Sequence, residues 1–251
     1  MSLVDYRAWI REVYETNYEY RELFKNGEAH PPIFFFGDPN GAVAATVGVN
    51  PSAEEFIPAR GWGPEYENSD LLIQRCRIYF DNPKGISPHP WFSIWKDFLN
   101  KIGLSYRTDP RAIHLDLSPR ATRSMSSLQR GSKKLLNLFL DLVEHDSKYL
   151  FEQLRTFKAI KHLYVAGSVT KKYYLIEFLE NRQRELGCRL KTLVPFRRGS
   201  QGKLGLYTID VGDNLPRYLF FCSTSPSARV RPHPLPQKAR WLIDKYPEFA
   251  P

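Results

Sequence analysis

The apolar positions of residues 3–26 recur at roughly helical spacing, so the chain is expected to open with a helix. Asn26-Gly27 is a common stop signal and is expected to end it. The sequence predicts further helices at residues 69–80, 91–103, 127–157 (one long helix or two consecutive ones), 170–186 and 234–246.

Shorter apolar runs between these helices are typical of β-strands. Residues 31–52 predict a hairpin, because two β-rich runs flank the turn-forming sequence DPNG at residues 38–41. The second run, Ala42–Val47, is apolar on both faces, as expected near the centre of a sheet. Further strands are predicted at Ala112–Pro119, Ile160–Ser168, 189–194 and Arg217–Thr224.

Strands and helices therefore alternate, and most connections are long enough for crossovers. This order predicts an α/β fold, a three-layer α/β/α sandwich with a central, largely parallel sheet. No internal repeat, low-complexity linker or clear boundary divides the chain. We expect a single domain over residues 1–251, in which residues 1–30 form an N-terminal helical extension.

Composition limits the class of protein. The 251 residues are 42% hydrophobic and 25% charged, which is typical of a soluble globular protein. No apolar stretch approaches the roughly 20 residues of a membrane helix, and the N-terminus lacks the apolar centre of a secretion signal. We expect no membrane partner and a cytoplasmic location, nucleoid-associated in a prokaryote. The three scattered cysteines form no CxxC pair, which disfavours zinc and iron–sulfur sites.

The net charge of +9 is concentrated in two segments. Arg107–Lys134 holds seven basic residues against two acidic ones, and Arg197–Arg240 holds eight against two. Clustered positive charge is what a polyanion-binding surface requires. Solubility alone is the other explanation for a moderately basic chain.

Four predicted strands end in small or polar residues, in the stretches GVNPS, HLDLSPRAT, VAGSVTKK and CSTSPSARVRP. In an open parallel sheet, binding sites form outside the carboxyl ends of the strands. Each stretch also has a purely structural interpretation. Asn50 or Ser52 could cap a helix that starts near Ala53. His114 and Asp116 share one face of a strand and could form a structural contact, and the other two stretches could be ordinary turns.

Together, in this order, the motifs resemble the uracil-DNA glycosylase superfamily, most closely its mismatch-specific and thymine-DNA branch. VGVNPS (Val47–Ser52) resembles the first motif, a Gly-x-Asn-Pro turn. LYVAGSVTKK (Leu163–Lys172) resembles the central strand with its glycine turn, and STSPSARV (Ser223–Val230) resembles the second motif. The resemblance spans Ile33 to about Tyr246. The N-terminal helix and residues 69–110 match no motif.

The resemblance implies a monofunctional, metal-independent DNA glycosylase of base-excision repair, with no cofactor. Such an enzyme flips a damaged or deaminated base out of the duplex and hydrolyses its N-glycosidic bond. Asn50 matches the catalytic residue that positions the attacking water. An amide orients water but is a poor base, so slow catalysis is expected. Backbone amides in the Gly48–Ser52 turn, which includes the base-pocket residues Gly48 and Val49, are expected to meet an oxygen of the base.

The resemblance also implies a base pocket with one stacking ring and one residue that reads the base edge. Trp62 is the candidate for stacking, with Phe56 and Tyr66 as rivals and core packing as the alternative. His114 or Asp116 falls where family members often carry Asn. An ionised Asp only accepts hydrogen bonds and would favour a base edge rich in N–H donors. Uracil is therefore in doubt as the substrate.

In the second motif, Ser225 stands where fast members carry a catalytic His. Its hydroxyl cannot supply positive charge to the leaving base. Ser227 matches a phosphate-gripping serine, and Arg229 matches the wedge that fills the gap left by the flipped base. The other residues expected to contact DNA are Ser52, Arg120, Arg123, Lys171, Lys172 and Arg231.

The expected partner is DNA, either a duplex with a lesion or mismatch or a single strand, bound by a monomer. Two alternatives remain. The missing His at Ser225 and the acidic Asp116 fit a nucleic-acid-binding protein of the same fold with little or no catalysis. A different α/β enzyme could use the same strand ends on a nucleotide or another phosphate ester. The chain lacks a P-loop and a G-x-G-x-x-G signature, so this last alternative is disfavoured.

Overall fold

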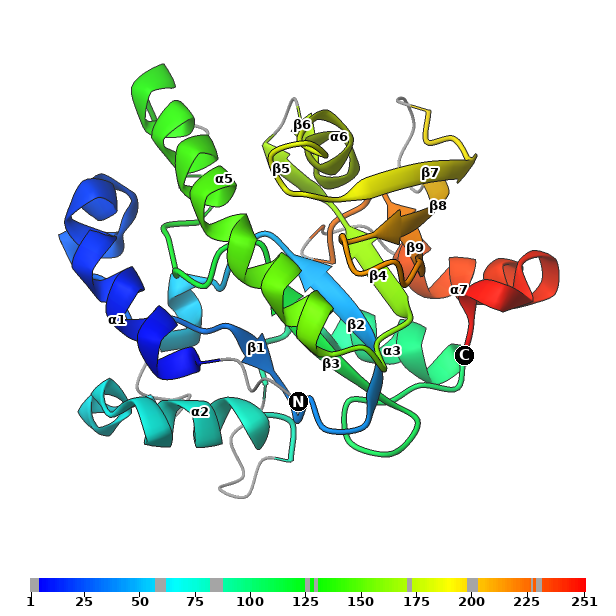
Figure 1. The fold of residues 1–251 in the computed structure, drawn as a ribbon, viewed down its shortest axis with the longest axis horizontal. Helices are drawn as coiled ribbons and strands as arrows, with labels where there is room; N and C mark the ends of the chain where they lie inside the picture. Colours follow the sequence, from blue (N-terminus) through cyan, green and yellow to red (C-terminus); the bar gives the residue numbers. More distant parts are fainter. Residues whose placement is uncertain are drawn as a thin grey trace.

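The computed structural model of the protein describes residues 5–56, 62–81, 88–124, 127–128, 131–170, 173–197, 203–226, 228 and 232–251. In these residues a seven-stranded sheet has the order β1-β3-β2-β4-β9-β8-β7. Helices lie on both of its faces (Figure 1). The predicted α/β class is thereby confirmed, and the arrangement is compatible with a three-layer sandwich.

The centre of the sheet consists of four parallel strands. They are β3 (Arg111–Asp116), β2 (Ala42–Gly48), β4 (His162–Ala166) and β9 (Arg217–Cys222). Val47 of β2 lies opposite Leu115 on one side and Val165 on the other. Strands on both sides and helices on both faces bury β2 almost completely, which explains its continuous apolar run.

Antiparallel strands complete both edges. They are β1 (Phe35–Phe36), β7 (Arg189–Val194) and β8 (Leu204–Asp210). The strand β8 was not predicted. The predicted hairpin of residues 31–52 is wrong, because β1 pairs with β3, and β3 lies between β1 and β2. The DPNG turn is present, but parallel pairing with β3 occupies the side of β2 that a hairpin partner would take.

Six α-helices and several short elements connect these strands among the described residues. The helices are α1 (Tyr6–Thr16), α2 (Ser69–Arg77), α3 (Trp91–Lys101), α5 (Lys133–Thr156), α6 (Leu175–Asn181) and α7 (Pro234–Lys245). The 3-10 turns are η1 (Asn17–Leu23), η2 (Lys25–Gly27), η3 (Ala53–Phe56), η5 (Pro64–Glu67) and η6 (Pro247–Phe249). A small second sheet pairs β5 (Ser168–Thr170) with β6 (Tyr173–Tyr174). None of the described helices is long and apolar enough to cross a membrane.

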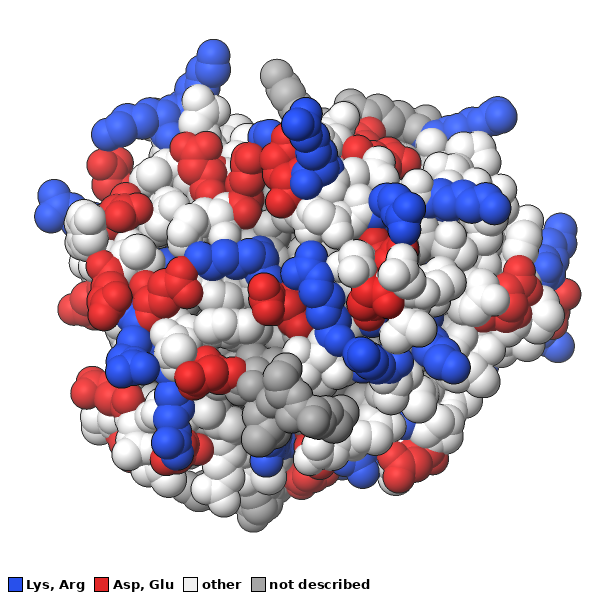
Figure 2. Space-filling view, in the orientation of Figure 1, with Lys and Arg blue, Asp and Glu red and all other residues white. Residues whose placement is uncertain are grey.

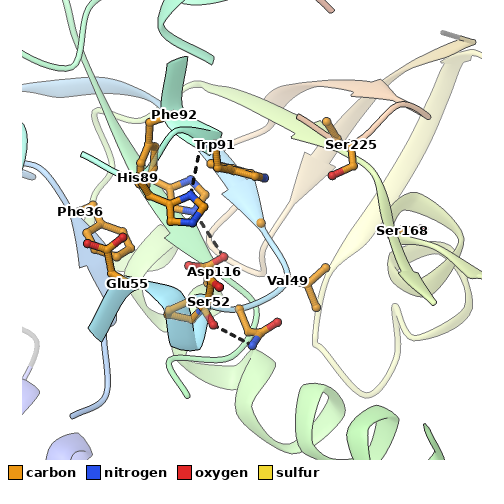
Figure 3. Close-up of a pocket in the computed structure, with 15 residues that line it drawn as sticks. Phe36, Val49, Ser52, Glu55, His89, Trp91, Phe92, Asp116, Ser168 and Ser225 are labelled. Atoms are coloured by element: carbon orange, nitrogen blue, oxygen red, sulfur yellow. Dashed lines mark hydrogen bonds and ion pairs between the residues drawn. The ribbon is translucent and has the colours of Figure 1, made fainter. Parts of the chain in front are cut away.

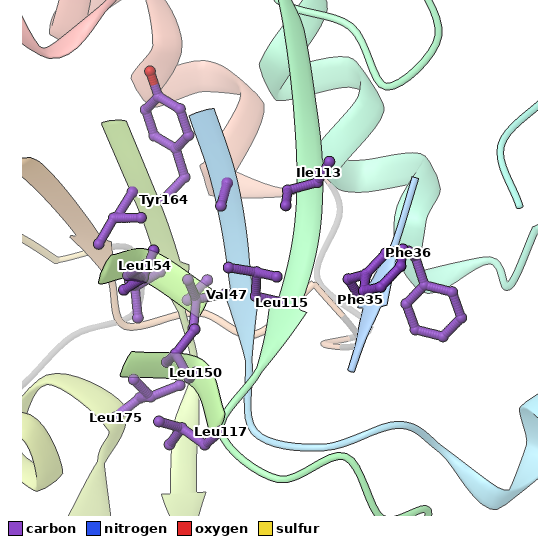
Figure 4. Close-up of a cluster of buried hydrophobic side chains, with 14 of the residues drawn as sticks. Phe35, Phe36, Val47, Ile113, Leu115, Leu117, Leu150, Leu154, Tyr164 and Leu175 are labelled. Atoms are coloured by element: carbon purple, nitrogen blue, oxygen red, sulfur yellow. The ribbon is translucent and has the colours of Figure 1, made fainter. Parts of the chain in front are cut away.

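The hydrophobic core lies on both faces of the central strands. In Figure 1, α5 crosses in front of the sheet, whereas α3 and α7 lie behind it. Leu150 of α5 approaches Val47 of β2 in the cluster drawn in Figure 4. On the other face, the Phe98 ring of α3 lies 5.2 Å from Tyr164 and 5.4 Å from Phe220, measured between ring centroids. The two helical layers thus hold the strand ends in fixed relative positions.

Two predicted helices are shorter than expected. The first ends as an α-helix at Thr16 and continues as the 3-10 turn η1. There the guanidinium of Arg120 donates to the Val13 carbonyl and so satisfies one of the unpaired acceptors at the helix end. Among the described residues of the predicted helix 170–186, which leave out 171 and 172, only Leu175–Asn181 is α-helical. The residues before it include β-branched and aromatic side chains, which favour the small β5–β6 sheet.

Candidate active site

The carboxyl ends of the four parallel strands surround a cavity of about 250 Å³ (Figure 3). Asn50 follows β2 and Asp116 ends β3, while Ser168 and Ser225 follow β4 and β9, and all four residues line the cavity. Parallel strands place these ends at one edge of the sheet, which is why residues distant in sequence meet here. Other residues singled out from the sequence also line it, namely Gly48, Val49, Ser52 and His114.

Gly48 allows the first and second strand ends to approach each other closely. A Cβ atom at this position would collide with Oδ1 of Asp116 and lie 3.2 Å from two atoms of the His114 ring. Backbone hydrogen bonds fix the approach, because Leu117 N–H donates to the Gly48 carbonyl and Ser118 N–H to the Val49 carbonyl. The turn after β2 therefore needs a residue without a side chain.

We expect Gly48→Ala to lower the free energy of unfolding by about 1–3 kcal/mol, because the added methyl group displaces Asp116 and His114. Urea denaturation of the single and double variants measures this effect. In an Asp116→Ala background the colliding oxygen is gone, so the same substitution should be less destabilising. An equal loss in both backgrounds would contradict the proposed collision.

The side-chain amide of Asn50 is held by three acceptors. Its Nδ2 donates to the Pro51 carbonyl at 3.0 Å, the Arg120 carbonyl at 3.1 Å and Thr122 Oγ1 at 2.9 Å. Carbonyl oxygens cannot donate, so the atom facing them must be the NH2 group. This assignment leaves Oδ1 as the acceptor that Asn50 can offer at the cavity that it lines. An acceptor held in this way can orient a water molecule.

A chain of buried polar contacts links Tyr106, Thr46, His114 and Asp116. Burial raises the pKa of the Tyr106 phenol, and its hydroxyl shares a hydrogen bond of 2.6 Å with Thr46 Oγ1. Thr46 Oγ1 in turn shares a hydrogen bond of 2.9 Å with His114 Nδ1. On the other side of the ring, His114 Nε2 lies 3.3 Å from Oδ1 of Asp116. Asp116 thus presents its carboxyl group in the cavity wall beside His114.

Three aromatic rings from two elements enclose His114. The ring centroids of Trp91, Phe92 and Phe36 lie 4.7, 5.2 and 6.0 Å from that of His114. Trp91 and Phe92 begin α3, within residues 69–110, where no motif was recognised, and Phe36 ends β1. All three line the cavity, and sequence reasoning missed them. The sequence signal that could have pointed to Trp91 and Phe92 was weak. It consisted of two aromatic residues at the start of a predicted helix, directly after a Pro-rich segment.

The prediction that Trp62 or Phe56 faces this cavity is wrong. Neither lines it, and both instead border a separate hollow with residues of the N-terminal segment, such as His30. Trp62 is buried, as in the alternative of core packing, and its indole N–H donates to Oε1 of Glu55 at 3.2 Å. The Phe56 ring stacks on His30 at 4.5 Å, and the rival Tyr66 is buried against Trp62.

Trp62 nevertheless affects the cavity through Glu55, a lining residue that the sequence did not point to. Glu55 is only 3% exposed, and its Oε1 accepts hydrogen bonds from Trp62 and from the Tyr79 hydroxyl at 2.8 Å. The stacking residue expected from the resemblance thus holds a carboxylate in place. No spacing rule connects Glu55 to the cavity, because η3 turns it inward only in the folded chain.

The prediction that Arg120 contacts phosphate is also wrong, because its side chain is 2% exposed and fully engaged. Its Nε donates to Asp146 at 2.9 Å, and its other nitrogens donate to Asn17 Oδ1 and Thr16 Oγ1, each at 2.7 Å. The guanidinium therefore fastens α1 to α5 inside the protein. Its backbone carbonyl, however, is one of the three acceptors that hold Asn50.

Ser225 is positioned by contacts of its backbone. Its carbonyl accepts a hydrogen bond from His233 Nε2 at 3.0 Å, while His233 Nδ1 accepts from the Leu235 N–H at the start of α7. On the other side, Gly167 has a φ of +92°, and a Cβ there would lie 3.1 Å from Cβ of Ser225. Glycine at the exit of β4 therefore makes room for the Ser225 segment beside the cavity.

The remaining predicted DNA contacts are only partly described. Ser52 lines the cavity, and its Oγ accepts from Glu54 N–H at 3.2 Å, which is the capping role considered for it. Arg123 is exposed, and its Nε donates to the Phe24 carbonyl. Ser227, Arg229, Arg231, Lys171 and Lys172 lie outside the described residues.

Charge on the visible face is mixed. Figure 2 shows Lys and Arg interspersed with Asp and Glu rather than gathered in one stripe. Several of the basic residues form ion pairs, such as Arg189 with Asp210 and Arg182 with Glu144, each at about 2.8–2.9 Å. A basic DNA-binding surface therefore stays a prediction from the sequence.

Comparison with known proteins leaves the family open. No protein-family model matches the chain. A search of curated proteins likewise finds no match. Within the described part of the chain, no group of three or more His, Cys, Asp and Glu side chains could hold a metal ion.

Proposed function

We propose that the protein is a DNA glycosylase of the uracil-DNA glycosylase superfamily, which acts as a monomer and hydrolyses the N-glycosidic bond of a base flipped out of DNA. The observation that carries the proposal is the held amide of Asn50. Its Nδ2 is occupied by three acceptors, so Oδ1 is the atom offered at the cavity. This is the geometry needed to orient a water molecule.

The cavity supports the proposal by its size and walls. Its volume of about 250 Å³ lies just below the range of roughly 300–1,000 Å³ for pockets of drug-sized ligands, which suits a single flipped base. Aromatic rings and a buried acceptor line it, and these are the groups that stack on a base and read its edge.

The reaction divides naturally into two steps at such a site. The bond between C1′ and the base nitrogen breaks first, and its electron pair leaves with the base. The water oriented by Asn50 then adds to the sugar cation and gives up a proton, which leaves an abasic site. The carboxylate of Asp116 stabilises positive charge that develops in the cavity. Asn50 contributes by orientation rather than as a base, which fits a slow enzyme.

A panel of labelled duplexes tests the proposal, with uracil, thymine mismatches, hypoxanthine and alkylated purines as the lesions. We expect the purified protein to excise at least one of them, read as strand scission after alkali treatment. Absence of scission above background on every duplex would contradict the proposal. If the protein then still bound DNA with a steep dependence on salt, the alternative of a non-catalytic nucleic-acid-binding protein would be supported. That alternative is favoured by Ser225, whose hydroxyl cannot supply charge to a leaving base.

A further inference from the structure

Two side chains with a carboxyl group, Glu55 and Asp116, are among the described residues that line the cavity. Asp116 is 6% exposed, and Nε2 of its neighbour His114 lies 3.3 Å from its Oδ1. No Lys or Arg is present among the described residues that line the cavity. The second lining histidine, His89, accepts the Trp91 N–H with Nδ1 and lies with Nε2 3.8 Å from Glu54. No fixed positive charge of the described lining residues therefore faces Asp116 across the cavity.

Glu55 adds a second carboxylate, held by two aromatic side chains that also pack against a guanidinium. The guanidinium of Arg75 lies 5.2 Å from the Trp62 ring and 5.4 Å from the Tyr79 ring, and these are the two rings that hydrogen-bond Glu55. Arg75 itself does not line the cavity. Asp116 is consequently the principal carboxylate of the cavity wall, and Glu55 is a secondary one.

A buried carboxylate discriminates between leaving groups of different charge. A neutral base, such as uracil or hypoxanthine, departs as an anion when it takes the electron pair of the glycosidic bond. The nearby charge of Asp116 opposes this departure, and Ser225 supplies no compensating cation. A base that already carries a positive charge departs as a neutral molecule. In the bound state that cation is attracted by Asp116 and by the faces of the surrounding aromatic rings.

We propose that the substrate base is cationic, a purine alkylated at a ring nitrogen such as 7-methylguanine or 3-methyladenine, an inference that rests on the proposed glycosylase function. The atoms balance without a further reactant. Cleavage of the C1′–N bond delivers its electron pair to the purine and cancels the positive charge. Water then bonds to C1′ and releases one proton to the solvent. Asp116 in place of an amide and Ser225 in place of a histidine then share one explanation, because a cationic leaving group needs neither an amide donor nor a positive partner.

Single-turnover excision rates test this inference, each expressed relative to spontaneous base loss from the same duplex. For the wild-type protein we expect the enhancement for 7-methylguanine or 3-methyladenine to exceed that for uracil and hypoxanthine by about 10²-fold or more. Asp116→Asn keeps the shape and an acceptor for His114 but removes the charge. It should reduce this preference by about 10-fold or more.

The control is Asp97→Asn, which removes one exposed carboxylate from α3 and should leave the preference unchanged. A larger enhancement for uracil or hypoxanthine in the wild-type protein would overturn the cationic-base inference and leave the glycosylase proposal standing. Excision of none of the bases would overturn both. An Asp116→Asn variant that folds and retains the full preference would also overturn the inference. If that variant does not fold, the wild-type preference alone decides.

Discussion

Asp146→Ala is expected to lower the free energy of unfolding by about 3–5 kcal/mol, the largest effect on stability that we anticipate. Asp146 is fully buried on α5 and accepts hydrogen bonds from Arg120 Nε at 2.9 Å and Ser118 Oγ at 2.6 Å. Without it the guanidinium of Arg120 stays buried with no counterion. Denaturation in urea, followed by circular dichroism, measures the loss.

The matched control is Asp141→Ala, which removes an exposed carboxylate from the same helix and should change stability by less than about 0.5 kcal/mol. Arg120→Ala should be far less destabilising in the Asp146→Ala background than in the wild-type protein, because the two residues form one network. Additive losses would show that the ion pair is not the source of the effect.

Asn50→Ala is expected to reduce the excision rate by about 10²–10⁴-fold, on whichever duplex the panel shows to be the substrate. The substitution removes the acceptor that orients the water while the cavity walls remain. Single-turnover kinetics with saturating enzyme measure the chemical step separately from DNA binding. Circular dichroism must show that the variant is folded under the assay conditions.

Thr122→Val separates the position of the amide from its presence. It removes one of the three acceptors of Asn50 Nδ2 and keeps Oδ1. Loss of one hydrogen bond of about 0.5–1.5 kcal/mol corresponds to a rate reduction of roughly 2- to 13-fold. A full rate for Asn50→Ala would contradict the proposed role of the amide. A reduction by Thr122→Val as large as that by Asn50→Ala would show that Thr122 itself takes part.

The predictions from sequence were correct for elements that are determined by the residues of a short segment. The apolar run Ala42–Val47 became the buried strand β2, and three other runs predicted as strands became β3, β4 and β9. The hairpin of residues 31–52 failed because strand pairing is a long-range choice. Its turn residues are compatible with several strand pairings. In the fold, β3 lies between β1 and β2 and pairs with both.

Some residues of the candidate site could be predicted from the sequence, and others could not. Asn50, Asp116 and Ser225 could be brought together from the sequence, because polar residues after consecutive parallel strands meet at one edge of the sheet. Trp91 and Glu55 could not, since they reach the cavity from a helix and a 3-10 turn outside the sheet. Arg120 was placed on the surface because an arginine in a basic segment usually lies there.

The sequence by itself therefore determined the fold class, the central strands and the polar residues at their carboxyl ends. The spacing of apolar residues depends only on neighbours in the chain, so it can be read from a short stretch of sequence. The carboxyl ends of parallel strands lie at one edge of the sheet, so the residues after each predicted strand can be assigned to that edge. Only the tertiary structure decided which polar partners surround the site. It placed Tyr106, Thr46 and His114 in one hydrogen-bonded chain beside Asp116, and it turned Arg120 inward toward Asp146. Hydrogen bonding and burial depend on partners that are 60 and 68 residues away along the chain, and no local pattern in a single sequence encodes those contacts.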